Sequence, residues 1–176
     1  LESQGVKMAD YDDVRKGIKE YAEYNILLDP NETNYTLSRL VDVQEVIRHK
    51  SPIPAMKAIK NEAEIRGYRS AMLKDGIALV KFLRWLKPAV EAGGQTEISI
   101  DKKLTSQPLF RDISFDTIAG YGAHGAIVHY EATPETDIPL EPHGLLLLDS
   151  GAQYQDGTTD ITRTIALGPV SDYEKH

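Results

Sequence analysis

The apolar pattern of the chain begins with short elements of different kinds. In residues 11–21 apolar side chains recur at helical spacing behind Asp10, which is suited to cap a helix, and residues 26–28 form a short apolar run that ends at Asp29. This pattern predicts a helix and then a strand. Two prolines in residues 51–54 then disfavour regular helix, because proline lacks an amide donor and restricts the residue before it. We therefore expect a boundary between two regions there.

A long amphipathic stretch follows the prolines. Asn61 can cap a helix, and Glu62 and Glu64 place negative charge in its first turn, where the helix dipole favours it. One apolar stripe runs along this predicted helix and comprises Ile65, Tyr68, Met72, Leu79, Leu83 and Leu86. We expect Pro88 and the glycine pair at 93–94 to end the helix.

The rest of the chain combines a shorter helix with strands. Residues 96–108 predict a second helix, and residues 113–118 and 126–130 are strand-like. Two helices followed by several strands predict an α+β fold. We divide the chain into a small mixed α/β region, residues 1–54, and a second region, residues 55–176.

Three glycines, Gly120, Gly122 and Gly125, form a G-x-G-x-x-G pattern. A dinucleotide-binding site needs a helix immediately after such a pattern, and here the strand-like residues 126–130 follow. We therefore reject a nucleotide fingerprint. We expect these glycines to let backbone segments pass close to one another.

Charge and composition narrow the class of partner. The formal net charge is −7, whereas a general nucleic-acid binder needs clustered Lys and Arg against the phosphates. We expect a small or peptide-like partner and no nucleic acid. The chain has no cysteine, which is compatible with a reducing, cytoplasmic compartment. Its longest aliphatic run, residues 145–148, is far below the ~20 residues that a bilayer span requires, so we expect no membrane association.

The candidate chemistry lies in the last third of the chain. Residues 145–148 lead into Asp149, and the chain turns near Asp156-Gly157 before it reaches Asp160. Aspartate is common at strand ends, where it makes local hydrogen bonds, so both residues could be turn or surface groups. Asp149 follows a predicted buried strand, however, and a buried carboxylate needs a cation, a metal or several donors. Arg163 is one candidate counterion, so these residues alone leave metal binding open.

A resemblance decides between these alternatives. Residues 149–154 (DSGAQY) and 156–164 (DGTTDITRT) resemble the metal-binding signature of the Xaa-Pro aminopeptidases, also called aminopeptidase P. These enzymes belong with prolidase and methionine aminopeptidase to the pita-bread family. Residues 125–130 (GAIVHY) and 58–64 (AIKNEAE) match further family stretches in order and spacing. The resemblance covers essentially the whole chain, most specifically residues 54–175.

The resemblance implies an architecture and a reaction. Residues 55–176 would form the first half of a pita-bread catalytic domain, and residues 1–54 the tail and linker of a small creatinase-type domain. The parent protein would be a metal-dependent aminopeptidase that releases an N-terminal residue preceding proline. Its partner would be a peptide with proline at the second position, and relatives suggest a homodimer.

The resemblance also assigns roles to single residues. Asp149 and Asp160 would be metal ligands, with Asp160 bridging two divalent ions, most commonly Mn²⁺, which activate a water. Hard oxygen donors suit such ions, which lie ~3.5–4 Å apart in two-metal sites. His129 matches a family histidine that steadies the reacting groups. Without the resemblance, His129 reads as a strand histidine bonded to a backbone group.

The spacing of the two aspartates raises a geometric problem. A two-residue hairpin at Asp156-Gly157 sets Asp149 opposite Thr164, about four residues or ~13 Å from the level of Asp160. Two ligands of shared metals cannot lie that far apart. We therefore expect a bulge or strong strand curvature near residues 158–159.

The resemblance predicts what the chain lacks as well. The remaining family ligands are one histidine and two glutamates well downstream, whereas only Glu174 and His176 follow the signature here. We expect a truncated part of the parent enzyme that is nearly inactive alone. Two alternatives stay open for the parent: a metal-free pita-bread binding module and a prolidase-type dipeptidase. Creatinase, which is metal-free, agrees poorly with the resemblance to a metal-binding signature.

Overall fold

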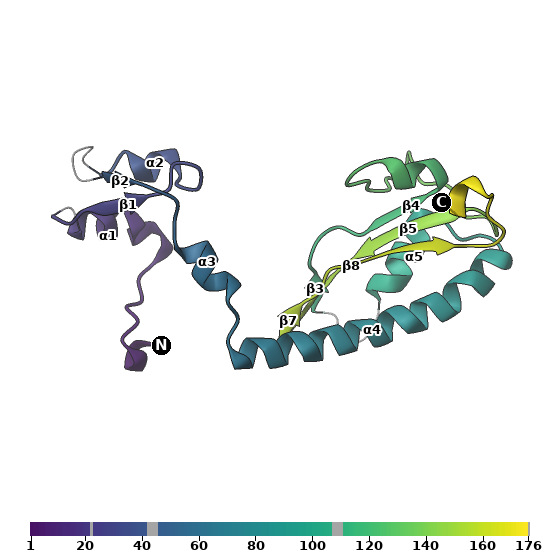
Figure 1. The fold of residues 1–176 in the computed structure, drawn as a ribbon, viewed down its shortest axis with the longest axis horizontal. Coiled ribbons are helices and arrows are strands. Elements are labelled where there is room, and N and C mark those ends of the chain that lie inside the picture. The colour runs from purple at the N-terminus through teal and green to yellow at the C-terminus, as the bar shows by residue number, and fades with distance from the viewer. Residues whose placement is uncertain (22, 42–45, 107–110, 176) are drawn as a thin grey trace. The chain divides into compact units, whose positions relative to one another are not determined.

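A computed structural model describes residues 1–21, 23–41, 46–106 and 111–175. The chain divides into two compact units (Figure 1), an N-terminal unit of residues 1–59 and a C-terminal unit of residues 60–176. The finer assignment of residues 1–54 and 55–176 to two domains stays a prediction. Helices and strands both contribute, which confirms the α+β fold class.

The N-terminal unit combines short helices with a two-stranded parallel sheet. Strands β1 (Ile26–Leu28) and β2 (Val46–Arg48) form this sheet, which confirms the strand predicted at residues 26–28. The helix predicted from residue 11 begins as a 3-10 turn, η2 (Tyr11–Asp13), and continues as α1 (Val14–Glu20). The other short helices of the unit are η1 (Glu2–Gln4), α2 (Tyr35–Ser38) and α3 (Ile53–Ala58).

The end of the N-terminal unit depends on one aspartate and two prolines. Asp29 is buried and accepts hydrogen bonds from the backbone N–H groups of Ser51, at 2.8 Å, and Asn31, at 3.0 Å. These bonds lower the pKa of its carboxyl group. The prediction that residues 51–54 disfavour helix was wrong, because α3 begins directly after Pro52 with Pro54 in its first turn. Proline is tolerated there since first-turn N–H groups have no partner within the helix.

The C-terminal unit begins with the long helix α4 (Glu62–Glu91). Its predicted cap is confirmed: Glu64 N–H donates to Asn61 Oδ1 at 2.9 Å, and Asn61 N–H donates to Glu64 Oε2 at 2.8 Å. Pro88, in contrast, lies inside the helix, so its prediction as the stop was wrong. A proline this close to the end removes one hydrogen bond of the last turns, and the helix continues to the glycine pair at 93–94.

The buried face of α4 only partly follows the predicted stripe. Leu79 and Leu86 are buried as predicted, whereas Ile65, Tyr68 and Met72 are 40–44% exposed. The side chains of α4 that are buried are Ala71, Asp75, Ala78, Leu79, Phe82, Leu86 and Val90. Two apolar faces thus share the helix, and contact with the sheet selects one of them.

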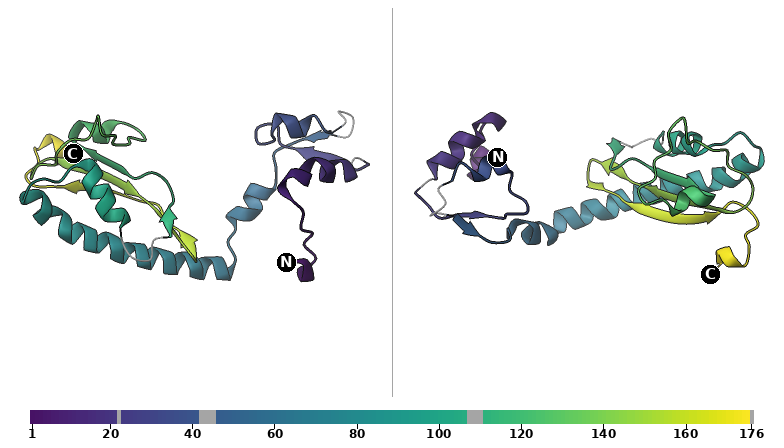
Figure 2. Two further views of the ribbon diagram at one scale, coloured as in Figure 1. Left: turned by 180° about the vertical axis from the view of Figure 1, so that it is seen from behind. Right: turned by 90° about the horizontal axis from the view of Figure 1, so that it is seen from above.

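Two three-stranded antiparallel sheets follow α4 and α5 (Glu97–Thr105) in the chain. The first has the order β4 (Ile118–Tyr121), β5 (Leu145–Ser150), β8 (Ile161–Ala166), and the second has the order β3 (Asp112–Ile113), β6 (Ala152–Tyr154), β7 (Gly157–Thr158). Helices α4 and α5 lie along one side of the first sheet, and the part of the segment between β4 and β5 that contains η4 lies on its other side (Figures 1 and 2). Residues 138–140 of the same segment pack with the core on the helix side. The core lies between the helices and the sheet.

The predictions of two strands in this unit were wrong. Residues 113–118 do not form one strand, because β3 and β4 at its two ends belong to different sheets. Residues 126–130 form no strand at all: a 3-10 helix, η4 (Gly122–Ala126), is followed by a turn. The missing side chain of Gly120 allows the chain to fold back here, since a Cβ at this position would lie 2.8 Å from the backbone nitrogen of Gly125. The close backbone approach expected of the three glycines is thereby confirmed for Gly120 and Gly125, whereas a Cβ on Gly122 would meet no atom within 4 Å.

The remaining end points add two details. Helix α5 ends at Thr105, and residue 108, the predicted end, lies outside the described residues. A 3-10 turn, η5 (Tyr173–Lys175), ends the described chain. Within the described ranges, no helix has the length and apolar character needed to cross a bilayer.

Candidate metal centre

Strand β5 places Asp149 on the sheet face that points away from the core. Leu146 and Leu148 are 0% and 1% exposed, and the residues that alternate with them, including Leu147 and Asp149, are half-buried. The antiparallel ladder sets Asp149 opposite Thr162 of β8. Thr162 Oγ1 donates a 2.8 Å hydrogen bond to Asp149 Oδ1, which fixes the carboxylate and leaves Oδ2 without a hydrogen bond to any described residue.

The turn between the two aspartates differs from the prediction by one residue. Tyr154 pairs with Gly157, so the two turn residues are 155–156 and not 156–157. Beyond the turn, Ser150 pairs with Ile161 in the same register. No residue is added to either strand between these pairs, so the bulge predicted near residues 158–159 was wrong, and the alternative of strong strand curvature stays a prediction.

This register brings the two aspartates together. One further step from the β5–β8 ladder sets Asp160 opposite Gly151, and alternation puts Asp160 on the same face as Thr162, the partner of Asp149. Diagonal neighbours on an antiparallel pair lie ~7–8 Å apart, and somewhat less between Cβ atoms. Moving the turn by one residue moves the partner of Asp149 from Thr164 to Thr162, which removes the geometric problem.

The ladder opens at Gly151, where the chain passes from one sheet to the next. A Cβ on Gly151 would collide with Ser114 Oγ and with the carbonyl oxygen of Thr159. Ser114 fills the opening: its N–H donates to Gly151 O at 3.1 Å and its hydroxyl to Thr159 O at 2.9 Å. Ser114 therefore holds the backbone between Asp149 and Asp160, and position 151 has no room for a side chain.

The charges around the two carboxylates are not balanced by the described residues. Asp160 is exposed and makes no hydrogen bond or ion pair with any of them. Arg163, the candidate counterion, lies opposite Leu148 on the other face of the sheet and donates from Nη1 to Thr162 O at 2.7 Å. The alternative that Arg163 neutralises Asp149 is thus not supported. Carboxylate oxygens without protein cations are the donors that Mn²⁺ and Mg²⁺ prefer.

Two aspartates are nevertheless a partial donor set. Among the described residues, no three His, Cys, Asp or Glu side chains gather into a group that could hold a metal ion. Glu174 instead accepts from the backbone N–H and the hydroxyl of Ser171, both at 2.7 Å, and these bonds lower its pKa. His176 lies outside the described residues. The residues present fit two ligands of a metal site and no more.

His129 lies in the turn that follows η4, so its interpretation as a strand histidine was wrong. Its φ of 56° is the one positive value among the described non-glycine residues, and its side chain is exposed. The loop packs on the face that carries Asp149, because a Cβ on Gly125 would lie 3.3 Å from the Cβ of Leu147. No contact within the described chain joins the imidazole to Asp149 or Asp160. Through Gly125, the loop that carries His129 lies on the same side of the sheet as Asp149.

Sequence reasoning missed a buried polar cluster beneath this loop. Glu97, at the start of α5, is 0% exposed and contacts His124, Tyr121 and Tyr130. The partners lie 24 to 33 positions away in the sequence, so no local pattern indicates them. Burial raises the pKa of the Tyr130 hydroxyl, and the bond to the Glu97 carboxylate adds to this shift.

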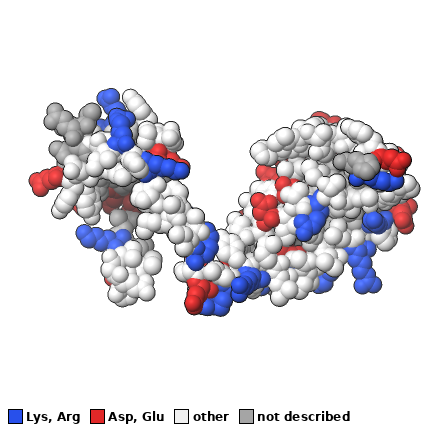
Figure 3. Space-filling model, viewed as in Figure 1, with Lys and Arg blue, Asp and Glu red and all other residues white. Residues whose placement is uncertain are grey.

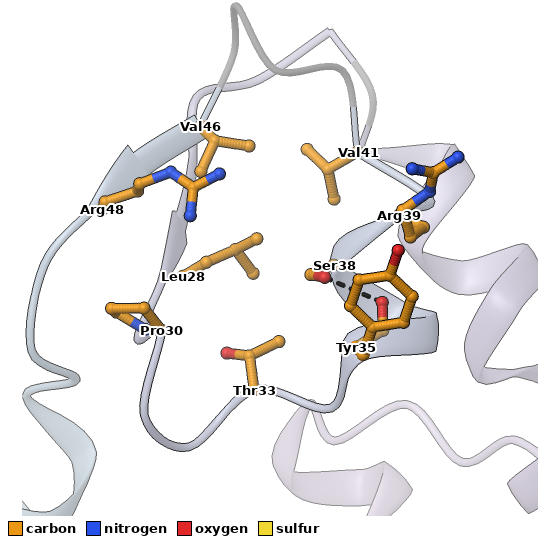
Figure 4. Close-up of a pocket in the computed structure, with 9 residues that line it drawn as sticks. All are labelled: Leu28, Pro30, Thr33, Tyr35, Ser38, Arg39, Val41, Val46 and Arg48. Carbon is orange, nitrogen blue, oxygen red and sulfur yellow. Dashed lines mark hydrogen bonds between the residues drawn. The ribbon is translucent and has the colours of Figure 1, made fainter.

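The N-terminal unit has a cavity of a different character. It has a volume of about 700 Å³ and lies between β1, β2 and α2 (Figure 4). Apolar side chains such as Leu28 and Val46 line it together with Arg39 and Arg48, and none of the described lining residues carries a carboxylate or an imidazole. The cavity belongs to the N-terminal unit, whereas the two aspartates belong to the C-terminal unit.

Comparisons with known proteins assign the chain to a family. Residues 66–176 match metallopeptidase family M24, and residues 1–64 match the creatinase/prolidase N-terminal domain. The chain belongs to metallopeptidase family M24. The N-terminal unit and the C-terminal unit correspond to these two matches in order.

Relatives within family M24 include named aminopeptidases. Aminopeptidase P2 of Arabidopsis thaliana is 36% identical over 99% of this chain and 30% of its own length. The structure of X-prolyl aminopeptidase from Caenorhabditis elegans, described as a cytosolic enzyme with a di-nuclear active site, matches with a TM-score of 0.82 and 32% identity over 98% of this chain and 30% of that one. A Xaa-Pro dipeptidase from Bacillus anthracis matches with a TM-score of 0.74 and 26% identity, over 97% and 48%. The chain thus spans about 30% of the length of each of these two aminopeptidases.

Proposed function

We propose that this M24 chain is part of a metal-dependent Xaa-Pro aminopeptidase, in which Asp149 and Asp160 hold two divalent ions. The observation that carries this proposal is the strand register, which sets both aspartates on one face of the sheet with oxygens that no described residue neutralises. The aminopeptidase relatives, one of them with a di-nuclear active site, support it. The substrate would be a peptide with proline at the second position.

Each residue of the candidate centre has a distinct role in this proposal. Asp149 would bind through Oδ2, while Thr162 orients the carboxylate through Oδ1. Asp160 would bridge the two ions, since both of its oxygens are free of described partners. The ions, most suitably Mn²⁺, supply an activated water as the nucleophile when bound. His129 would steady the reacting groups from the loop on the same face.

The chain alone should bind metal weakly and show negligible peptidase activity. The resemblance calls for one histidine and two glutamates beyond these two aspartates, and two carboxylates leave most coordination positions to water. We expect a dissociation constant for Mn²⁺ on the order of 1 mM or weaker. Hydrolysis of an Xaa-Pro peptide by the purified 176-residue chain, with contaminants excluded, would contradict this expectation.

Titration of Mn²⁺ into the chain, followed by the electron paramagnetic resonance signal of the free ion, tests the two ligands directly. Asp149→Asn and Asp160→Asn should each weaken the residual binding. Asp172→Asn is the matched control, because Asp172 is exposed and pairs with Lys175 at 2.7 Å, and it should leave binding unchanged. Equal binding by all four proteins would remove the metal assignment.

Two alternative functions make different predictions for the longer protein in which we place this chain. A metal-free binding module would lack the downstream histidine and two glutamates. The sequence of the longer protein beyond the signature therefore distinguishes this module from the enzyme. A prolidase-type dipeptidase, suggested by the Bacillus anthracis relative, would cleave Xaa-Pro dipeptides rather than longer Xaa-Pro-Yaa peptides. The two aspartates together with His129 favour the enzyme, and the aminopeptidase relatives favour the longer substrate.

The setting of the enzyme follows from the same reasoning. We propose a cytoplasmic location, as described for the Caenorhabditis elegans enzyme, and a homodimer of the complete protein. Acidic and basic side chains are interspersed on the face shown in Figure 3, in keeping with a peptide rather than a nucleic acid as partner. Size-exclusion chromatography with light scattering would test the dimer.

A further inference from the structure

The buried carboxylate of Glu97 connects both ends of the loop that carries His129 to helix α5. Glu97 Oε1 accepts the backbone N–H of Tyr121 at 2.7 Å, at the end of β4 where the loop begins. Glu97 Oε2 accepts the hydroxyl of Tyr130 at 2.8 Å, directly after His129. The Nδ1 of His124 lies 3.0 Å from each of the two oxygens. One side chain therefore holds the beginning, the middle and the end of the loop.

The surroundings suit a charged carboxylate at this place. Glu97 is the first residue of α5, where unpaired N–H groups and the helix dipole favour negative charge. Its hydrogen bonds come from one backbone and two side-chain donors, which offset the desolvation of a fully buried group. The rings of His124 and Tyr130 pack at 4.5 Å between centroids, so the two side-chain donors also support one another.

The conformation of His129 shows why such support is needed. A non-glycine residue at a φ of 56° is intrinsically disfavoured, and it persists only where the surrounding structure fixes it. The imidazole of His129 is exposed and has no described partner of its own. The restraint must therefore come through its neighbours, and the adjacent Tyr130 is anchored by Glu97.

We infer that Glu97, His124 and Tyr130 form a positioning unit that holds the loop of residues 122–130 and sets His129 over the metal face. This inference rests on the proposed role of His129 in the reaction. The unit touches no substrate and acts through His129 alone. Its loss should lower kcat and leave KM unchanged, since substrate contacts are not altered.

A double-mutant cycle in the longer, metal-loaded protein tests the inference. Tyr130→Phe removes one hydroxyl while keeping the ring, and Glu97→Gln keeps the shape while changing the donor pattern, so that two variants guard against a folding failure. Each should lower kcat about tenfold, as sub-ångström misplacement of a reacting group does, with KM changed less than twofold. In a His129→Ala background the same substitutions should change kcat less than twofold. Equal losses in both backgrounds would show a merely structural role and overturn the inference.

A matched control and a second measurement separate this inference from the proposed function. Asp137→Ala removes the bond from Ile98 N–H at 3.1 Å, at the same end of α5, and should leave kcat unchanged. In the 176-residue chain, Tyr130→Phe should speed amide hydrogen exchange of residues 122–130 at least fivefold, and unchanged exchange overturns the positioning unit whatever the activity. A His129→Ala protein with full kcat would instead refute the proposed role of His129.

Discussion

Helix α4 carries two interior glycines in opposite surroundings, and replacing each by alanine tests how the hairpin between the two aspartates is held. A Cβ on Gly67 would lie well inside van der Waals contact of the carbonyl oxygen of Asp156 and 3.3 Å from its carbonyl carbon. A Cβ on Gly76 would meet no atom within 4 Å. The turn at residues 155–156 cannot simply move away, because Lys74 Nζ binds Asp156 Oδ2 at 2.6 Å.

The two substitutions should therefore have opposite signs. Gly76→Ala should raise the free energy of unfolding by about 0.5–1 kcal/mol, the difference in helix propensity. Gly67→Ala gains the same amount but adds the strain of forcing apart two backbone segments, about 2–3 kcal/mol at the upper end of overpacking costs. The net effect of Gly67→Ala should be a loss of about 1–2 kcal/mol, and the two variants should differ by about 2–3 kcal/mol.

Urea unfolding followed by the fluorescence of Trp85 measures this difference. Trp85 is the single tryptophan of the chain, and it packs against the core of the C-terminal unit, so its signal reports on that unit. The slope of the free energy against urea should be the same for both variants, which makes the midpoints comparable. Equal stability of Gly67→Ala and Gly76→Ala would refute the packing of the hairpin on α4, and with it the way the backbone around Asp160 is held.

Three further predictions follow from contacts near the site and along α4. Leu148→Ala, beside Asp149, should lower the free energy of unfolding in urea by about 2–5 kcal/mol. Val80 is exposed, so Val80→Ala should lower it by less than about 0.5 kcal/mol. Similar losses for the two variants would contradict the assignment of Leu148 to the core. Asn61→Ala should cost about 1 kcal/mol in thermal unfolding, whereas the aspartate variant, which can still cap, should cost little. The hydrogen bond from Lys74 lowers the pKa of Asp156 below its ordinary value of 3.8, so this stabilisation is present above that value and lost as pH falls through the lowered pKa. Lys74→Met should therefore reduce stability at neutral pH and flatten its decline in acid, and parallel pH curves for the two proteins would contradict the pairing.

Features that depend on neighbouring residues were predictable from the sequence. The cap at Asn61 forms as predicted, and Glu64, which was predicted only as a first-turn charge, returns a hydrogen bond to it across three-residue spacing. The apolar runs at residues 26–28 and 145–148 form strands, because a short apolar run favours an extended, buried segment. The resemblance in residues 149–164 was also a matter of local sequence, and the family match confirms it.

Features that depend on distant contacts were predicted poorly. Residues 126–130 have the composition of a strand, but the close approach of Gly120 and Gly125 turns the chain back before a strand can form. Pro88 has the chemistry of a helix stop, yet it lies within the last turns of α4, whose inner face packs on the sheet. The apolar stripe of α4 was shifted because two of its faces are apolar and only one meets the sheet.

The sequence by itself determined the family signature, the two carboxylates and the cap of α4, because these reside in residue identity and in contacts a few positions apart. Only the tertiary structure decided that Asp149 and Asp160 share a face, since a one-residue change in the turn moves every cross-strand partner by two. It also decided that Glu97 lies buried beneath the His129 loop, because hydrogen bonds across 24 or more positions form only when the sheet and α5 have come together.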